Sequence, residues 1–347
     1  MPSVTRLEPR ASPEHRPPRM SPQSVFFPTA ESAVRALDLQ TREALALSLE
    51  RLAVRARHLL PSAVDLSAAC RAVRDERVSP GATAAYFELV PALQAGDRLL
   101  AENCWRRIAA APTVAPGIQR QPFDSRALGE DAGRFQRLLA IGWGGQEMFA
   151  TPEDQEWKTF DQLAGEALDR LRAIAPAWHD EVQSLVVRIY GALPAASSAR
   201  GFSSASSRMV WGALFINLRR NAEPLRVLSA VVHEATHQML FGLSHQIPLT
   251  ENPPEERYSS PLRPDARPMD GVYHATYVAA RLTLLYHLLQ ASAALPPDER
   301  AQAAERCTFM REKFTQGLDV VRQHGRLSAL GWELMDAAED GLKAIAA

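Results

Sequence analysis

Residues 225–241 read LRVLSAVVHEATHQMLF, and this stretch is predicted to form a helix. Its apolar residues recur at the spacing of one buried helical stripe: Leu225, Leu228, Val232, Ala235 and Met239. Within the stripe, His233 and His237 are four positions apart, so on a helix both rings project from one face. Two such imidazoles can bind a single metal ion, at about 2.0–2.1 Å if the ion is zinc.

Glu234 follows the first histidine directly and completes the pattern HExxH. In hydrolases with this pattern, the glutamate is the general base that acts on a metal-bound water. The pattern is short, but here two histidines and a glutamate lie on an apolar helix, where their burial is costly without a satisfying partner. The alternative is a pair of core histidines bonded to backbone carbonyls, with the glutamate in a salt bridge.

A third protein ligand would come from further along the chain. One class of peptidases has the longer pattern HExxHxxGxxH, and it is excluded because leucines stand where its glycine and last histidine would be. Glu255 and Glu256 lie in a proline-broken segment that favours a loop over a ligand-bearing helix. His274 is the better candidate, because it falls in the first turn of a helix predicted to begin near Asp270.

Residues 258–271 read YSSPLRPDARPMDG, between the two predicted helices. Arg263 and Arg267 are each followed by proline, which favours an extended backbone. Arginine binds carboxylates through two parallel hydrogen bonds, so the segment predicts a site for a small dicarboxylate or an acidic peptide. Arg281 follows His274 by two helical turns and is a third candidate anchor. The alternative is that these arginines pair with acidic residues of the same loop.

Two segments resemble a known family, the HExxH-motif peptide-modification proteins encoded with ribosomally made natural products. They are HEATHQ at residues 233–238 and YSSPLRPDARPMDGVYHATYVAAR at residues 258–281. The resemblance covers roughly residues 225–290. It implies an iron(II)- and 2-oxoglutarate-dependent oxygenase that hydroxylates a β-carbon in a ribosomally synthesised precursor peptide.

The same resemblance implies roles for residues of the two segments. The iron ligands would be His233, His237 and His274. The arginine that holds 2-oxoglutarate would be Arg263, Arg267 or Arg281. One departure is that the usual non-haem iron oxygenase has two histidines and a carboxylate as ligands, which leaves the role of Glu234 open.

A zinc metallopeptidase acting on a peptide is the alternative function, since many proteins with the bare HExxH motif are peptidases. Glu234 would then be the general base, and Tyr258 or Tyr277 would stabilise the oxyanion. The arginine-rich segment favours the oxygenase. The native metal stays open, because histidine-rich sites accept several metals.

Composition narrows the classes of partner and compartment. The chain has 347 residues, of which 46 % are apolar, and its formal net charge is −1, so no overall attraction to nucleic acid or to membranes is expected. The three cysteines are far apart, which argues against a disulfide framework. We find no apolar signal sequence and no uncharged apolar run of about 18 residues, and expect a cytoplasmic protein.

The rest of the chain is predicted to be mainly α-helical with a small antiparallel β-sheet next to the HExxH helix, an α+β fold. Strands are expected within Ser184–Leu193 and Arg208–Leu218, which are rich in β-branched and aromatic residues. The predicted organisation is a disordered tail at 1–25, a helical region at 26–175 and a metal-binding region at 176–347. Alternatively, the last two regions form one continuous domain.

Overall fold

The computed structural model describes residues 21–28, 32–55, 66–110, 114–141, 145, 147–196, 198, 201–245 and 247–345. These residues are mainly helical, with one small mixed sheet, which confirms the predicted α+β class. The predicted tail at 1–25 extends too far, because Pro22–Phe26 form helix α1 and the side chains of Val25 and Phe26 are buried. Residues 1–20 of that tail lie outside the described residues.

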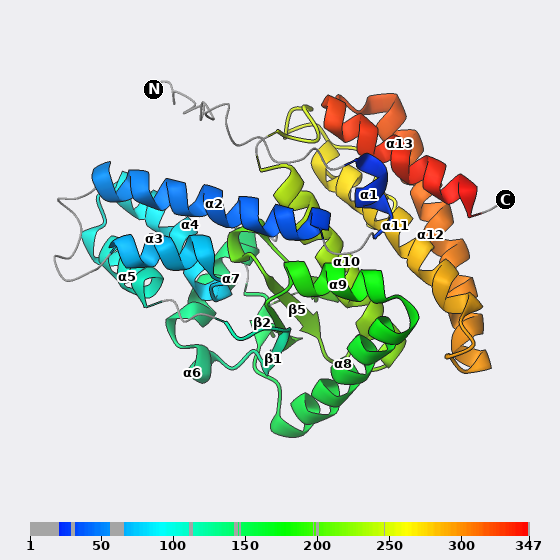
Figure 1. Ribbon diagram of the computed structural model, residues 1–347, viewed down its shortest axis with the longest axis horizontal. Coiled ribbons are helices and arrows are strands. Elements are labelled where there is room, and N and C mark those ends of the chain that lie inside the picture. The colour runs from blue at the N-terminus through cyan, green and yellow to red at the C-terminus, as the bar shows by residue number, and fades with distance from the viewer. Residues whose placement is uncertain are drawn as a thin grey trace.

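The first half of the chain forms the helices drawn from blue to green in Figure 1. They are α2 (Ser32–Arg55), α3 (Leu66–Asp75), α4 (Pro80–Ala95), α5 (Arg98–Ala109), α6 (Ser125–Leu128), α7 (Glu130–Ala140), α8 (Asp154–Ile174) and α9 (Pro176–Leu185). Proline begins α4 and α9, where its missing N–H costs no helical hydrogen bond. α5 begins where the Asp97 side chain accepts a 3.0 Å hydrogen bond from the backbone N–H of Leu100.

Four helices make up the C-terminal part: α10 (Pro224–Leu243), α11 (Met269–Ala291), α12 (Pro297–His324) and α13 (Ala329–Ala344). α10 carries the HExxH motif and α11 carries His274, as the sequence predicted. In Figure 1, α10 lies between the sheet and α11, while α12 and α13 form the outer layer.

The sheet has the strand order β1-β3-β5-β4, and β2 pairs with β3 outside this path. The strands are β1 (Gln119–Pro122), β2 (Phe149–Ala150), β3 (Arg188–Pro194), β4 (Ser204–Ala205) and β5 (Ala213–Asn217). The predicted antiparallel arrangement is wrong for the two main strands: β3 and β5 are parallel, in register from Arg188↔Ala213 to Ala192↔Asn217. Residues 195–212 make the connection, which is long enough for the crossover that parallel strands require.

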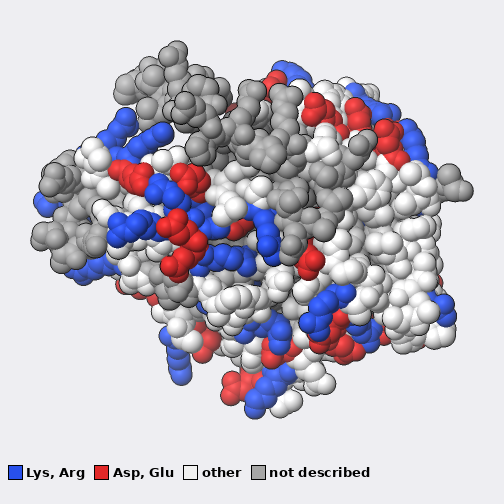
Figure 2. Space-filling model, in the orientation of Figure 1, with Lys and Arg blue, Asp and Glu red and all other residues white. Residues whose placement is uncertain are grey.

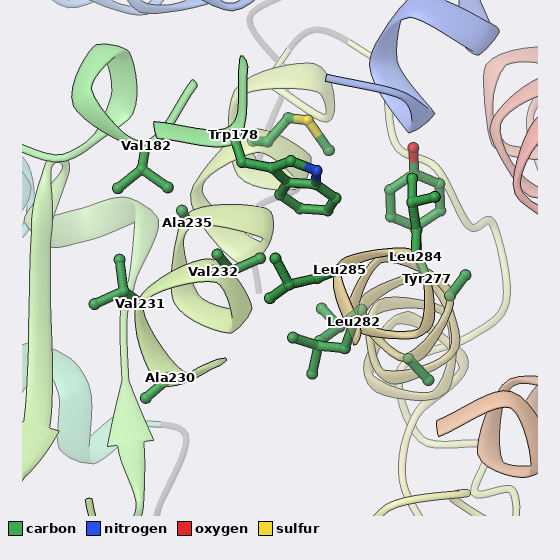
Figure 3. Close-up of a cluster of buried hydrophobic side chains, with 14 of the residues drawn as sticks. Trp178, Val182, Ala230, Val231, Val232, Ala235, Tyr277, Leu282, Leu284 and Leu285 are labelled. Carbon is green, nitrogen blue, oxygen red and sulfur yellow. The ribbon is translucent and has the colours of Figure 1, made fainter. Parts of the chain in front are cut away.

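Both faces of the sheet are covered by core side chains, and all five residues of β5 are buried. One face packs against α10, and the core continues from there to α9 and α11. Figure 3 shows Trp178 of α9 above Val232 of α10 and Leu285 of α11, which lie next to each other. The other face carries an aromatic cluster in which Phe215 stacks on Phe149 with ring centroids 4.6 Å apart. The sheet therefore fixes α10, and α10 fixes α11.

Residue 175, the predicted regional boundary, does not separate two cores. The largest hydrophobic cluster runs from Val25 to Leu342 and includes side chains of α8, which precedes that residue. A separate cluster joins α2, α3, α4 and α5 around the fully buried Trp105. The helical region thus has a core of its own and also contributes to the core that supports α10.

In Figure 2, Lys and Arg side chains lie next to Asp and Glu side chains at the left, along the bottom and at the upper right, while the right-hand middle of this face is mostly uncharged. Of the described helices, none has the length and apolar content needed to cross a membrane.

Candidate functional site

His233 and His237 lie one turn apart on α10, in the conformation that the sequence pattern predicted. Their Nε2 atoms are 3.2 Å apart, and their ring centroids are 4.9 Å apart. Two nitrogen ligands at about 2.0–2.1 Å from one ion are about 2.9–3.4 Å apart, depending on the coordination geometry. The two Nε2 atoms therefore have the spacing of two ligands of a single metal ion.

His274 lies against this pair, in the first turns of α11. Its Nδ1 is 3.2 Å from the Nδ1 of His237, and the two rings stack at an interplanar angle of 17°. Its Nε2 is 3.7 Å from a carboxylate oxygen of Asp270, one turn earlier on the same helix. The structure thus brings together all three histidines that the sequence singled out.

The three rings form a cluster but not a preformed coordination sphere. His237 meets His233 through Nε2 and His274 through Nδ1, so the two contacts lie at different nitrogens of one ring. Accordingly, no group of three or more His, Cys, Asp or Glu side chains among the described residues is arranged to hold a metal ion. The donor set fits a metal through the His233–His237 pair, and His274 is the nearest histidine that could join it.

The pKa values of two of these rings are lowered. Burial lowers the pKa of His237 well below its usual value, and the neighbouring His233, His274, Arg263 and Arg267 lower it further. Burial also lowers the pKa of His274, against a smaller opposing effect of Asp270. Both rings are therefore neutral at pH 7, which is the protonation state in which an imidazole binds a metal.

Glu234 is buried beside His233. Its Oε2 accepts a 2.6 Å hydrogen bond from the Ser206 hydroxyl, and its Oε1 is 3.9 Å from Nε2 of His233. The adjacent Gln238 amide lies 3.5 Å from the Ser207 carbonyl oxygen, so α10 holds residues 206–207 at two points. Ser206 was not among the residues predicted from the sequence, and only the structure relates it to Glu234.

A pocket of about 540 Å³ opens beside His274. Its walls come from the end of α7, the segment after β4, the C-terminal half of α10, and the loop that leads into α11. The lining residues are Leu138, Leu139, Ile141, Ala205, Ser206, Ser207, Arg208, Met209, Phe241, Ser244, Pro248, Leu249, Arg263, Arg267, Asp270 and His274. Arg263 and Arg267 are thus both in the pocket wall with His274. A cavity of this size accommodates a small ligand together with part of a larger one.

Arg267 is held at the pocket by its backbone and not by an acidic partner. Its N–H and C=O exchange hydrogen bonds of 2.8 Å with Tyr258, and its side chain lies beside Gly271 at the start of α11. Across the described residues, no Asp or Glu lies within ion-pair distance of the Arg267 guanidinium. By contrast, buried Arg134 pairs with Glu88 and Asp131.

Arg281 does not have the position that the sequence suggested. It is fully buried away from the pocket lining, pairs with Glu181 of α9, and lies 4.3 Å over the ring of Trp178. It also donates hydrogen bonds to the carbonyls of Val25 and Phe26. Its expected role as a carboxylate anchor is therefore corrected to a structural one, because α11 is buried around its whole circumference and this side faces α9 and α1.

The two tyrosines proposed for oxyanion binding also lie outside the pocket lining. Tyr277 is fully buried, with its ring edge-on to Phe26, and burial raises its pKa. The Tyr258 hydroxyl donates to Glu256 and accepts a 3.0 Å hydrogen bond from Asn252. Neither hydroxyl is placed to act on a ligand in this pocket.

No protein-family model matches this chain, and a comparison with curated proteins also finds no match.

Proposed function

We propose that this protein is an iron(II)- and 2-oxoglutarate-dependent oxygenase that hydroxylates a β-carbon in a ribosomally synthesised precursor peptide. One observation carries the proposal: Arg263 and Arg267 line the same pocket of about 540 Å³ as His274, whose ring stacks on His237 of the HExxH motif. A zinc peptidase has no need of two arginines at this place. An oxygenase needs at least one, because its cosubstrate has a carboxylate at the end remote from the metal.

His233 and His237 would hold the iron through their Nε2 atoms, with His274 as the third ligand. An imidazole that binds a metal carries no negative charge, so the carboxylate of 2-oxoglutarate nearer the iron would supply negative charge there. When bound, iron with 2-oxoglutarate supplies the oxidising chemistry: O₂ is divided between the hydroxylated peptide and succinate, and CO₂ is released. The chain's own residues bind, orient and enclose the reactants.

Arg267 is the favoured anchor for the distal carboxylate of 2-oxoglutarate. It projects from a backbone that is fixed on one side by Tyr258, and it has no acidic partner within the described parts of the chain. Leu138, Met209 and Phe241 contribute apolar surface to the same pocket, which displaces water and strengthens a guanidinium–carboxylate pair.

The test is anaerobic loading with iron(II), followed by oxygen, with and without 2-oxoglutarate and with the peptide encoded by a neighbouring gene. We expect succinate in amounts that match a peptide product heavier by one oxygen atom. His237→Ala should abolish both products, and Arg51→Gln, a change at an exposed arginine of α2, should leave them unaltered. Iron-loaded protein that consumes no 2-oxoglutarate with the peptide present would contradict the proposal.

A zinc peptidase is the second candidate, because a Glu234 oxygen lies 3.9 Å from Nε2 of His233. In that function, Glu234 would accept a proton from the attacking water. Zinc-loaded protein that cleaves the peptide without 2-oxoglutarate, and loses this cleavage on Glu234→Gln, would favour the peptidase.

A further inference from the structure

We propose that Arg208 binds an acidic side chain of the peptide substrate, at a position that flanks the residue to be modified. This inference relies on the proposed function for the identity of the substrate as a peptide. It assigns Arg208 a role in substrate selection, separate from the role of Arg267 in binding the cosubstrate.

Arg208 lies in a different wall of the pocket from the other two arginines. It begins the 3₁₀ turn Arg208–Val210, which follows β4, whereas Arg263 and Arg267 precede α11. The Ser207 hydroxyl accepts a 3.2 Å hydrogen bond from the backbone N–H of Met209 and so caps this turn. The Arg208 side chain is exposed, and its backbone is in an ordered turn next to α10.

The pocket lining contains few acidic side chains. Three arginines face one aspartate there, and that aspartate, Asp270, lies beside His274. No acidic side chain in the described ranges is within ion-pair distance of Arg208. If one cosubstrate carboxylate is bound by the arginines near α11, the Arg208 guanidinium, in the turn after β4, still has no acidic partner among the described residues. That guanidinium matches a second anionic group.

The strand next to Arg208 offers a place for such an extended peptide. β4 is the last strand in the sheet order, so one edge of Ser204–Ala205 is not paired with another strand of the described sheet. Ala205 and Ser206 also line the pocket. A peptide backbone pairing at this edge would pass the pocket, with apolar contacts to exposed Ile141 and with its acidic side chain near Arg208.

Selection from a random ten-residue peptide library tests this assignment without any turnover. The library is selected for binding to the iron-free wild type, to Arg208→Glu and to Arg51→Glu, each with 2-oxoglutarate present. Both substitutions reverse the charge of an exposed arginine, and only Arg208 lines the pocket. We expect Asp or Glu at one position among wild-type binders, Lys or Arg at that position for Arg208→Glu, and the wild-type preference for Arg51→Glu.

Selected peptides are then synthesised with the acid changed to its amide. For the wild type, the amide should weaken binding by about tenfold, the effect of losing one charge-assisted hydrogen bond. For Arg208→Glu it should not weaken binding. No peptide binding, no acidic preference in the wild type, or an acidic preference that survives Arg208→Glu would each overturn the assignment.

This experiment and the test of the proposed function have separate outcomes. An acidic preference that depends on Arg208, in a protein that never oxidises 2-oxoglutarate, would contradict the oxygenase proposal and support the peptide contact at Arg208. Peptide hydroxylation that does not depend on acidic residues of the peptide would support the oxygenase proposal and contradict the assignment of Arg208.

Discussion

The Ser206 hydroxyl, at the pocket wall, donates a 2.6 Å hydrogen bond to Oε2 of Glu234 on α10. Glu234 is 3 % exposed and lies between the two histidines in sequence. The carboxylate therefore links the segment after β4 to the helix that would hold the metal.

Glu234→Gln separates the two candidate functions. An amide oxygen can still accept the Ser206 hydrogen bond, so the link persists while the proton-accepting ability is lost. We expect 2-oxoglutarate consumption to fall less than about tenfold, whereas a general base would cost about 10²–10⁴-fold. Ser206→Ala is the complementary variant, because it keeps the carboxylate and removes its partner. It should lower the free energy of unfolding by about 1–3 kcal/mol in urea titrations.

Loss of one histidine should remove the metal. His237→Ala deletes a ring that contacts both other rings. Removing a hydrogen-bond partner of a metal ligand costs roughly 10–100-fold in metal affinity, and removing the ligand itself should cost at least as much. Iron content after equilibrium dialysis measures the effect. His179→Ala, a change on α9 away from the cluster, is the control, and equal iron content in the two variants would argue against this site.

Arg267→Gln should weaken 2-oxoglutarate binding without unfolding the protein. Hydrogen bonds to a charged partner contribute about 1.5–3 kcal/mol, so KM for 2-oxoglutarate should rise about 10–100-fold. Arg267→Lys should recover part of this loss, because the charge is kept and the two-pronged geometry is not. Initial rates at varied 2-oxoglutarate give KM, and an unchanged KM in Arg267→Gln would assign the cosubstrate elsewhere.

The buried pair of Arg281 and Glu181 should matter for stability and not for cosubstrate affinity. Arg281→Met leaves the Glu181 carboxylate buried without its partner and should cost about 3–5 kcal/mol. The double variant Arg281→Met with Glu181→Leu should lose less, because no buried charge remains. Chemical denaturation measures both. A rise in KM for 2-oxoglutarate with unchanged stability would return Arg281 to the cosubstrate site.

The Cys104 thiol should resist alkylation in the folded protein. Burial raises its pKa to about 11, and the side chain is fully enclosed on α5. At pH 8, a thiol with such a pKa is only about 0.1 % thiolate, the reactive form. Mass spectrometry after iodoacetamide treatment should find Cys104 modified in urea and unmodified in buffer.

The same shift predicts a loss of stability at alkaline pH. The unfolded thiol loses its proton near its ordinary pKa of about 8.5, while the folded one keeps it up to about 11. Between these pH values the folded state binds more protons, so the free energy of unfolding falls as the pH rises. Cys104→Ser should show a smaller fall over the same range.

Local sequence patterns were sufficient to predict the features that depend on a single helix. Apolar spacing predicted α10, and the spacing of four placed His233 and His237 on one face. The helix predicted to begin near Asp270 is α11. The prolines after Arg263 and Arg267 correctly predicted a segment outside the helices. They did not predict that both arginines line a pocket.

The features that depend on distant parts of the chain could not be predicted. The composition of β3 and β5 is equally suited to parallel and antiparallel pairing. Arg281 follows His274 by two turns, yet its partner Glu181 lies 100 residues earlier. Ser206 and Arg208 are ordinary polar residues of a Ser-rich segment until β4 places them at the pocket.

The contact of α1 with α13 joins segments that are separated by almost the whole described chain. During synthesis on the ribosome, the contact between α1 and α13 can form only after α13 has been synthesised. Contacts between such distant segments close large loops and slow folding. Arg281 of α11 donates hydrogen bonds to carbonyls of α1, so these contacts between α1 and α11 also form late in folding. Nascent chains lacking α13 should therefore expose apolar surface that chaperones bind.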